Sequence, residues 1–443
     1  MTLRKISIFT ALFSLLALSS AALFAQYNNS NNSAVGGVSI DASGILFNAN
    51  PGMTQEFISA RQAALQPIAA DLQKSSPNRK ISLKALDAAI AKYQSEGKPL
   101  PDEIQYMAGL KKIEFVFAFP DKNDIVLVGP AEPWKIGPNG APVGKETGEP
   151  IMLLEDFVVA LRTSLGEVRS PFACSIDPTQ QGLNNLSKYA SRIPANINPR
   201  VAANNIEKAM GNQSVRVEGI DATSHFARVM VSSDYQMKQI SMGVRPASVD
   251  GLPPFTKMIK SGNSGASNAL PRWWMAPNYA SLLRDESGLS WNLKDGSVKT
   301  MCETDFLAEN GQVKRGAGKT AAGVQKWADT MTSRFEDLSK AEPVFGQLRN
   351  CMDLAVVSAL IAKENMLSRV ANTFPALTQV ETFAFNAPKE VPCMAAVSKA
   401  RKVMVVCGGV EINHWAIVNK AEVKQDLSDM GKSIEFGETF YAD

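Results

Sequence analysis

The spacing of apolar residues changes partway along the N-terminal third of this chain, and this change constrains the fold class. Apolar residues in 57–72 and 83–93 recur at helical spacing, and Pro101 begins a third helical segment with acidic residues at its start. Residues 113–119 instead place Ile or Phe at every second position, which is strand spacing with one strongly apolar face. Residues 125–128 supply a returning strand. The sequence therefore predicts an α+β fold.

The next stretch predicts a long surface loop followed by a mixed α/β middle. Gly129–Pro150 is rich in Gly and Pro, which is typical of a surface loop, and the apolar spacing of 154–165 predicts a helix. The middle is expected to contain a strand at 171–176, a helix capped by Asp177 that runs to about Ser191, a helix at 199–210, and strands at 214–220 and 225–231.

The C-terminal part is expected to contain two long packed helices and a β-hairpin. Strands are expected around Trp273 and at 297–301, and apolar residues of 324–338 form one helical stripe. Pro343 begins the other helix, and its segment 354–361 is apolar nearly all round. That segment is shorter than the ~20 residues of a membrane-spanning helix, so we expect it in the core. Two further strands are predicted, at 391–397 and 403–406.

These elements divide the chain into five predicted parts, with a Gly/Ser/Asn-rich boundary at 261–268. The parts are a signal peptide at 1–25, a flexible Asn/Ser/Gly-rich linker at 26–50, helices with a β-hairpin at 51–168, an α+β module at 169–262, and strands with a two-helix core and C-terminal hairpin at 269–443.

The first 25 residues have the features of a secretory signal. Arg4 and Lys5 give a positive start, residues 6–18 are mostly apolar, and small residues place the cleavage after Ala25 or after Ala22. A membrane anchor is the alternative, but the apolar run is short for a span of ~20 residues. We therefore expect export to the periplasm or the cell exterior, with no transmembrane segment after cleavage.

Composition excludes several classes of function. The formal net charge of +3 falls by two, to +1, when the two cations of the signal are removed, so the mature chain offers no electrostatic basis for binding nucleic acid. With 2 His and 5 Cys, and neither HExxH nor CxxC, the sequence predicts no metal site, and it predicts no cofactor. Gly316–Thr320 resembles the end of a phosphate loop, but Val313 stands where the loop needs its first Gly.

One catalytic hypothesis stays open at this point. Cys174 could act as a nucleophile, with His225 or His414 as its base and Asp177 or Asp234 as the residue that orients the base. A lone Cys on an apolar strand is more often packed in a core or half of a disulfide. The spacing alone shows no contact between these residues.

Two other cysteines predict a cross-strand disulfide. If 391–397 and 403–406 form a hairpin centred on Ala400, Cys393 and Cys407 are directly opposed, with their Cα atoms about 4.5 Å apart. That separation is at the short edge of the disulfide range, and export permits the bond. The alternative register points the two sulfurs apart and leaves free thiols.

Arg272-Trp273-Trp274 suggests a stacking platform for a carbohydrate or a base. Adjacent residues of a strand point to opposite faces, so we expect one Trp in the core and the other exposed as a ligand-stacking candidate.

Five segments carry a resemblance to a known family. They are Gly129–Trp134, Cys174–Thr179, Ser224–Gly243, Leu270–Trp274 and Pro343–Ile361, and they extend from about Asp102 to Val418. In these segments the chain resembles a family of exported planctomycete proteins that is catalogued as a domain of unknown function. The resemblance implies a bacterial host and an exported product. It implies no activity, so no functional residue carries over.

The sequence as a whole favours a non-catalytic envelope or secreted protein that binds an envelope partner or a ligand. The alternative is a hydrolase that uses Cys174 with His225, or a pair of carboxylates. A structural component of a surface assembly is a third hypothesis, and it predicts large exposed apolar patches.

Overall fold

The computed structural model describes residues 37–194, 196–258, 269–307, 312–316, 318, 320–397, 403–424, 427, 431, 434, 437 and 439–443. The predicted signal peptide, the first part of the predicted linker and the predicted boundary at 261–268 lie outside the described residues. Helices and strands are both abundant, and the α+β fold class is confirmed.

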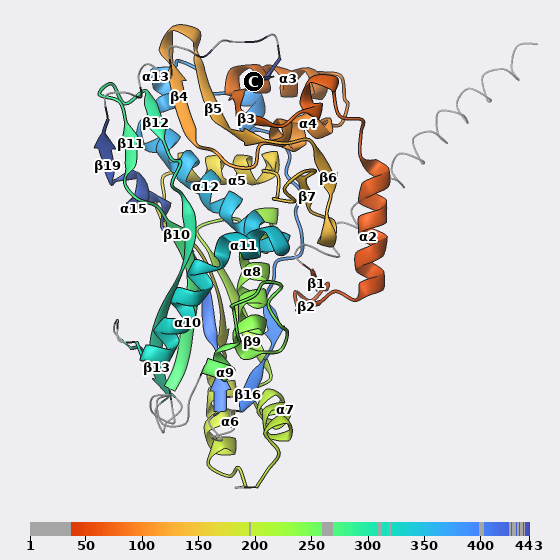
Figure 1. Cartoon of the computed structure of the whole chain (residues 1–443), viewed down its shortest axis with the longest axis vertical. Helices are drawn as coiled ribbons and strands as arrows, with labels where there is room; N and C mark the ends of the chain where they lie inside the picture. Colours follow the sequence, from red (N-terminus) through yellow and green to blue (C-terminus); the bar gives the residue numbers. More distant parts are fainter. Residues whose placement is uncertain are drawn as a thin grey trace, which may run out of the picture.

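Two seven-stranded sheets, made of strands among the described residues, form the frame of the molecule (Figure 1). We call them the upper and lower sheets after their places in that view. The upper sheet has the order β19-β11-β12-β4-β5-β3-β20. Its strands are β3 (Ser76–Ser82), β4 (Phe115–Phe119), β5 (Asp124–Ala131), β11 (Leu282–Arg284), β12 (Ser290–Asn292), β19 (Ala421–Val423) and β20 (Tyr441–Ala442).

The lower sheet has the order β14-β13-β10-β18-β8-β9-β15. Its strands are β8 (Phe172–Pro178), β9 (Asn212–Glu218), β10 (Ala269–Asn278), β13 (Ser297–Leu307), β14 (Val313–Lys314), β15 (Glu390–Pro392) and β18 (Cys407–Ile412). Strand β18 lies between β10, to which it is parallel, and β8, to which it is antiparallel. Each sheet thus combines strands from distant parts of the chain.

A buried helix, α12 (Pro343–Lys363), connects the cores of the two sheets (Figure 1). Apolar residues within 344–355 belong to the core beside the lower sheet, and those within 354–361 belong to the core beside the upper sheet. Among the described helices, α12 is the one long and apolar enough to cross a membrane, and its apolar window lies entirely inside the protein. The expected buried core helix is confirmed.

The remaining helices pack around this frame. They are α2 (Pro51–Ala64), α3 (Leu83–Ser95), α4 (Asp102–Gln105), α5 (Leu154–Leu165), α6 (Gln180–Ala190), α7 (Pro199–Met210), α8 (His225–Met242), α9 (Phe255–Met258), α10 (Ala322–Ser333), α11 (Phe335–Ala341), α13 (Met366–Arg369), α14 (Pro375–Thr378) and α15 (His414–Val418). Helix α8 packs against β8 and β18, α10 packs against β13, and α5 and α8 contact α12.

The predicted strand at 225–231 is wrong, because these residues begin helix α8. Ser224 caps the helix by accepting a hydrogen bond from the Ala227 backbone N–H at 3.1 Å. All residues of α8 are buried, including its Ser, Gln and Lys side chains. A helix surrounded by protein on every side needs no polar face, so its apolar residues lose the helical spacing that would identify it.

Two predicted irregular segments are folded. The end of the predicted linker forms the hairpin of β1 (Val38–Ile40) and β2 (Leu46–Asn48), in which Val38 and Leu46 are fully buried. The predicted surface loop 129–150 contains the end of β5 and the hairpin of β6 (Trp134–Ile136) and β7 (Pro142–Gly144). The Trp134 ring packs edge-on against Tyr106 at 5.8 Å, so the loop is part of the core.

Two helix boundaries also differ from prediction. Strand β8 continues through Asp177 to Pro178, and Thr179 caps α6 instead, accepting a hydrogen bond from the Gly182 N–H at 3.0 Å. The predicted helix over 324–338 is divided into α10 and α11, because Arg334 leaves the helical conformation.

The predicted disulfide is wrong, although the hairpin is centred as expected. Strand β16 (Ala395–Val397) pairs with β17 (Val403–Val405), with Ala395 opposite Val405. Pairing ends there, since Cys407 begins β18 and lies opposite Arg272 of β10. The sulfur of Cys393 lies 3.6 Å from that of Met210, and all five cysteines are free thiols.

Candidate functional site

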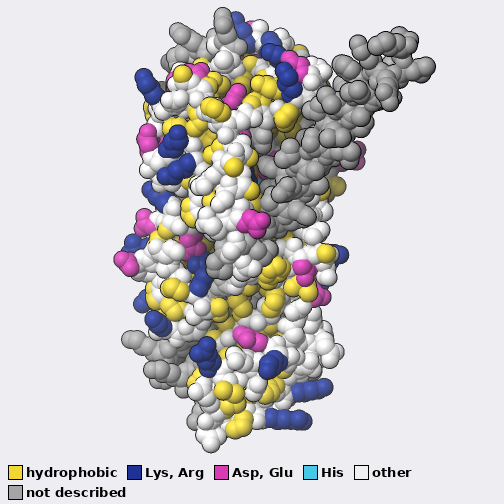
Figure 2. All heavy atoms as spheres, turned by 90° about the vertical axis from the view of Figure 1, so that its right-hand side faces the viewer, with side chains coloured by type: hydrophobic (Ala, Val, Ile, Leu, Met, Phe, Trp, Pro, Cys, Tyr) yellow, Lys and Arg dark blue, Asp and Glu magenta, His cyan; other side chains and the backbone are white. Residues whose placement is uncertain are grey.

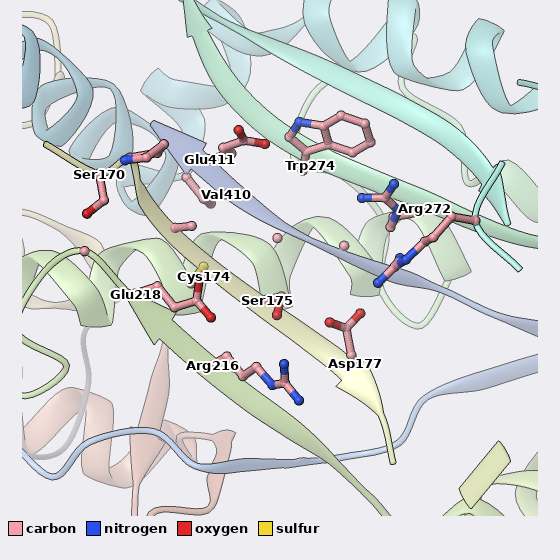
Figure 3. A pocket seen from close by; sticks show the side chains of 16 residues that line it. Ser170, Cys174, Ser175, Asp177, Arg216, Glu218, Arg272, Trp274, Val410 and Glu411 are labelled. Carbon is pink, nitrogen blue, oxygen red and sulfur yellow. The ribbon is translucent and has the colours of Figure 1, made fainter. Parts of the chain in front are cut away.

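A groove of about 460 Å³ crosses the face of the lower sheet opposite α8 (Figure 3). The burial of β8 shows how the strand forms it. Phe172, Cys174 and Ile176 are buried on the helix side, whereas Ala173 and Ser175 alternate with them and are half-buried on the groove side. Strands β9, β10 and β18 also line the groove, as does Arg315, which follows β14.

Strand pairing fixes which side chains are neighbours on the groove face. Trp274 lies opposite Gly409, Gly409 opposite Ser175, and Ser175 opposite Arg216. This row therefore has a Trp at one end, two small residues as its floor, and an Arg at the other end.

The glycines of the floor are required by the packing of the strands. A Cβ atom at Gly409 would lie 2.0 Å from the Cys174 carbonyl oxygen, and one at Gly408 would lie 2.1 Å from the Trp273 carbonyl oxygen. Both contacts are with neighbouring backbone, which has little freedom to move within the sheet. The groove is thus open at this point because β18 has no space for a side chain at Gly408 or Gly409 between β8 and β10.

The exposed tryptophan of the groove is supported by a charged network. The Arg272 guanidinium lies over the Trp274 ring, 4.7 Å from its centroid, and pairs with Glu303 and, at 3.2 Å, with Asp305. Arg315 also pairs with Asp305, at 2.8 Å. A hydrogen bond from the Gly318 N–H and the adjacent Arg272 lower the pKa of Glu303, so it remains ionised in this network.

The predicted division between the two tryptophans is confirmed. Trp273 has no exposed surface, packs at a tilt against Trp327 with a ring-centroid distance of 4.7 Å, and donates from Nε1 to the Val324 carbonyl oxygen at 3.1 Å. Trp274 is half-buried and lines the groove. A ligand-stacking role for Trp274 stays a prediction.

Several charged side chains of the groove have no partner in the described part of the chain. Asp177, Arg216, Glu218 and Glu411 line the groove and make no side-chain hydrogen bond or ion pair with any described residue. In total the lining carries three arginines and three carboxylates, so neither sign of charge dominates. These groups are free to bind a polar ligand.

The predicted nucleophile lies at the groove, but its thiol is on the helix side and makes no hydrogen bond to either histidine. Burial, and next the neighbouring Asp234, raise the pKa of Cys174 well above its usual range, so the thiol stays protonated. Asp234 is itself buried on α8, pairs with Lys238 at 3.0 Å, and has its pKa raised to about 6 by burial. Asp234 therefore lies in the core between α8 and β18, paired with Lys238, and does not orient a catalytic base.

The two histidines lie elsewhere. His225 lines a second cavity, where its Nδ1 is 3.0 Å from both carboxylate oxygens of Asp156. His414 is fully buried, packs at a tilt against Phe172 with a ring-centroid distance of 4.2 Å, and has its pKa lowered to about 4 by burial. Of the residues predicted for catalysis, the structure thus brings only Cys174 and Asp177 to the groove.

The groove overlaps a segment that matches a known family. Residues 174–255 match a family described as protein of unknown function (DUF1598). The matched segment includes most of β8, all of β9, and α8, so it contains six of the 16 residues that line the groove and the helix on the opposite face of the sheet. No curated protein and no solved structure matches the chain. The match supports a domain of unknown function, as expected from the resemblance.

Sequence reasoning missed much of this site. Arg216 and Glu218 were hidden in a short alternating strand, where exposed charges are the default and carry no signal. Gly408-Gly409 had a usable signal, since paired glycines inside an apolar strand mark a close approach of backbones. Glu411 follows them at the spacing that places it on the same face as Gly409.

Proposed function

We propose that this protein is an exported, non-catalytic binding protein whose groove takes a neutral oligosaccharide. The observation that carries the proposal is the Trp274 ring, fixed by Arg272, beside unpaired polar side chains across a glycine floor. The N-terminal sequence supports export, and the family match assigns no activity.

The chemistry of the groove fits a sugar better than a charged polymer. A sugar ring presents C–H groups that stack on an indole, and hydroxyl groups that donate to carboxylates and accept from guanidinium groups. Two of the three arginines are already paired with Glu303 and Asp305, so the unpaired groups are Arg216 and three carboxylates, which disfavours a polyanion. Figure 2 shows acidic and basic side chains interspersed over a large face of the molecule, without the basic patch that nucleic acid requires.

A second candidate function rests on two carboxylates of the groove. Glu411 of β18 and Glu218 of β9 both lie opposite Ala173 of β8, on either side of it. Two strand spacings of about 4.8 Å place their Cα atoms about 9.5 Å apart. Inverting glycoside hydrolases separate their two carboxyl groups by about 6.5–9.5 Å, a range that two Glu side chains can reach from Cα atoms this far apart. The same groove could therefore cleave the oligosaccharide that it binds.

The test is calorimetric titration of the mature protein with neutral hexasaccharides of β-1,4-linked glucose, N-acetylglucosamine, xylose and mannose. We expect at least one of these hexasaccharides to bind. The substitution Trp274→Ala is expected to weaken its affinity up to ~10-fold, since an aromatic stacking contact contributes about 0.5–1.5 kcal/mol. Met301→Ala is the matched control, because Met301 lies opposite Trp274 on β13 and outside the groove. Absence of binding, or equal binding by the Trp274 variant, would overturn the proposal.

The same samples distinguish binding from hydrolysis. A binding protein leaves the number of reducing ends constant over hours. New reducing ends that disappear in Glu218→Gln and in Glu411→Gln, but persist in Met301→Ala, would establish the hydrolase instead.

Export is tested separately by expressing the full chain and sequencing the N-terminus of the protein recovered outside the cytoplasm. We expect it to begin at Gln26 or Leu23, which follow the two predicted cleavage sites. An uncleaved N-terminus in the membrane fraction would support the anchor alternative.

A further inference from the structure

A second cavity, of about 490 Å³, lies apart from the groove and shares none of its lining residues. Helices α2 and α5, the segment around α4, and residues 379–385 surround it. Most of the lining is apolar, and its largest side chains are Phe57, Tyr106, Leu153, Leu154, Phe383 and Phe385. Cavities of this size and character, with a few polar groups converging on one point, are typical of small-molecule sites.

Two of the polar groups that line the cavity come from the first turns of two helices; the others are Arg61, Gln94, Lys98, Gln105, Gln379 and Glu381. Glu155 and Asp156 lie in the first turn of α5, and His225 is the first residue of α8. Glu155 and His225 line the cavity, whereas Asp156 lies behind His225 and is 4% exposed. Two segments that are distant in sequence thus place a carboxyl and an imidazole against one apolar space.

Asp156 determines which nitrogen of His225 can reach a ligand. Nδ1 lies 3.0 Å from both Asp156 oxygens, so this nitrogen donates to the carboxylate. Nε2 makes no hydrogen bond to any described residue. Although burial opposes the charged form, Asp156 raises the pKa of His225, so protonated Nε2–H becomes available as a donor.

Glu155 has an unused oxygen at the same place. Its Oε2 is buried and has no hydrogen-bond partner among the described residues. A buried carboxyl oxygen without a partner destabilises the empty protein, and a ligand that supplied a hydrogen bond would remove that cost. Burial also raises the pKa of Glu155.

We propose that this cavity binds a small aromatic molecule that carries a hydroxyl group, with the hydroxyl between Glu155 and His225. A hydroxyl both donates and accepts, so it can donate to Glu155 while accepting from the His225 Nε2–H. A carboxylate on the ligand would be repelled by ionised Glu155, and an ammonium group by protonated His225, so each fits the pair less well.

The experiment uses 2-naphthol as the probe and naphthalene as the same ring system without the hydroxyl. Affinities for the mature protein are measured by calorimetry at neutral pH, with 2-naphthoic acid as the anionic comparison. We expect 2-naphthol to bind at least ~10-fold more tightly than either of the others, because a site built for a hydroxyl rejects the analogue that lacks it.

Variants locate the binding. Glu155→Gln keeps the shape of the side chain and is expected to weaken 2-naphthol ~10-fold without changing naphthalene. Glu336→Gln is the control, because Glu336 also lies in the first turn of a helix but is outside the cavity. Trp274→Ala, in the groove, is expected to leave 2-naphthol binding unchanged, so this test stands independently of the oligosaccharide proposal.

Two results would overturn the inference. Equal affinity of 2-naphthol and naphthalene would show that the polar pair does not recognise the hydroxyl. Alternatively, Trp274→Ala could lose 2-naphthol binding at an unchanged melting temperature while Glu155→Gln still binds 2-naphthol as the parent does. That result would place the ligand in the groove.

Discussion

The buried carboxyl of Asp353 makes the stability of the protein depend on pH, by an amount that can be worked out from the structure. Asp353 lies within α12, is 1% exposed, and accepts a hydrogen bond from the Tyr279 hydroxyl. Its Oδ2 has no partner among the described residues. Burial raises the pKa of Asp353 to about 6, although Lys112 and the Tyr279 hydrogen bond oppose the shift.

The sign and size of the effect follow from proton binding. In the unfolded chain an Asp has a pKa of about 4. Between pH ~4 and pH ~6 the folded protein therefore binds more protons than the unfolded chain, so the free energy of unfolding falls as the pH rises through this window. A hundredfold difference in proton affinity corresponds to about 3 kcal/mol. This contribution is fully present below pH ~4 and is lost above pH ~6.

The substitution Asp353→Asn removes the titrating group while retaining an acceptor for the Tyr279 hydroxyl. Urea unfolding gives the free energy of unfolding of both proteins at pH 4 and pH 7. From pH 4 to pH 7, we expect the free energy of unfolding of the variant to rise by about 3 kcal/mol relative to that of the parent. Other titrating groups, such as Asp234, are common to both proteins and cancel.

Asp337→Asn is the matched control, since its side chain is 62% exposed on α11. Its effect on stability is expected to be the same at both pH values. If the Asp353 variant shows no pH-dependent difference from the parent, Asp353 is ionised at pH 4 in the folded protein and the reasoning from burial is refuted.

Further measurements test other parts of the structure. Gly409→Ala is expected to destabilise by about 1–3 kcal/mol in urea unfolding, because its Cβ meets backbone, whereas Gly323→Ala on α10, whose nearest neighbour would be 3.6 Å away, should not destabilise. Intact mass is expected to be unchanged by reductant, and Cys302, half-buried where the other thiols are buried, should label first; a mass gain on reduction would contradict this. Asp156→Asn is expected to lower the pKa of His225 in a ¹⁵N-histidine titration, with the chain's other histidine as internal reference; an unchanged value would refute the pairing.

The sequence predicted elements well where apolar residues recur at a clear period or fill a continuous run. The hairpin of β4 and β5, the helices α3, α5 and α7, and the buried helix α12 all lie where their spacing placed them. It failed where buried polar residues, or Gly and Pro, interrupt the apolar pattern. Helix α8 is buried all round, so its polar and apolar residues carry no period, and 129–150 looked like a loop because its Gly and Pro residues occur inside a tightly packed hairpin.

The groove could be predicted only in part, because its rows join strands that are far apart in the chain. The pattern Trp273-Trp274 correctly assigned one ring to the core and one to a half-exposed face. Nothing local indicated that β18 would lie between β10 and β8, since the disulfide hypothesis had assigned Cys407 to the neighbouring hairpin. Pairing over such separations is determined by burial of both sheet faces and not by any short motif.

The second cavity shows how one wrong local assignment can hide a site. When 225–231 is interpreted as a strand, His225 is an isolated residue and Asp156 is an ordinary acidic residue at a helix start. When 225–242 is a helix, both residues belong to first turns, where Asp is stabilised by the free backbone N–H groups and His is not. A His at such a position is retained by its carboxylate partner, as the 3.0 Å contacts show. Ser224, just before His225, was the sequence signal for a helix at this point, because Ser is a preferred helix N-cap. Its side chain accepts a hydrogen bond from the Ala227 N–H in the structure.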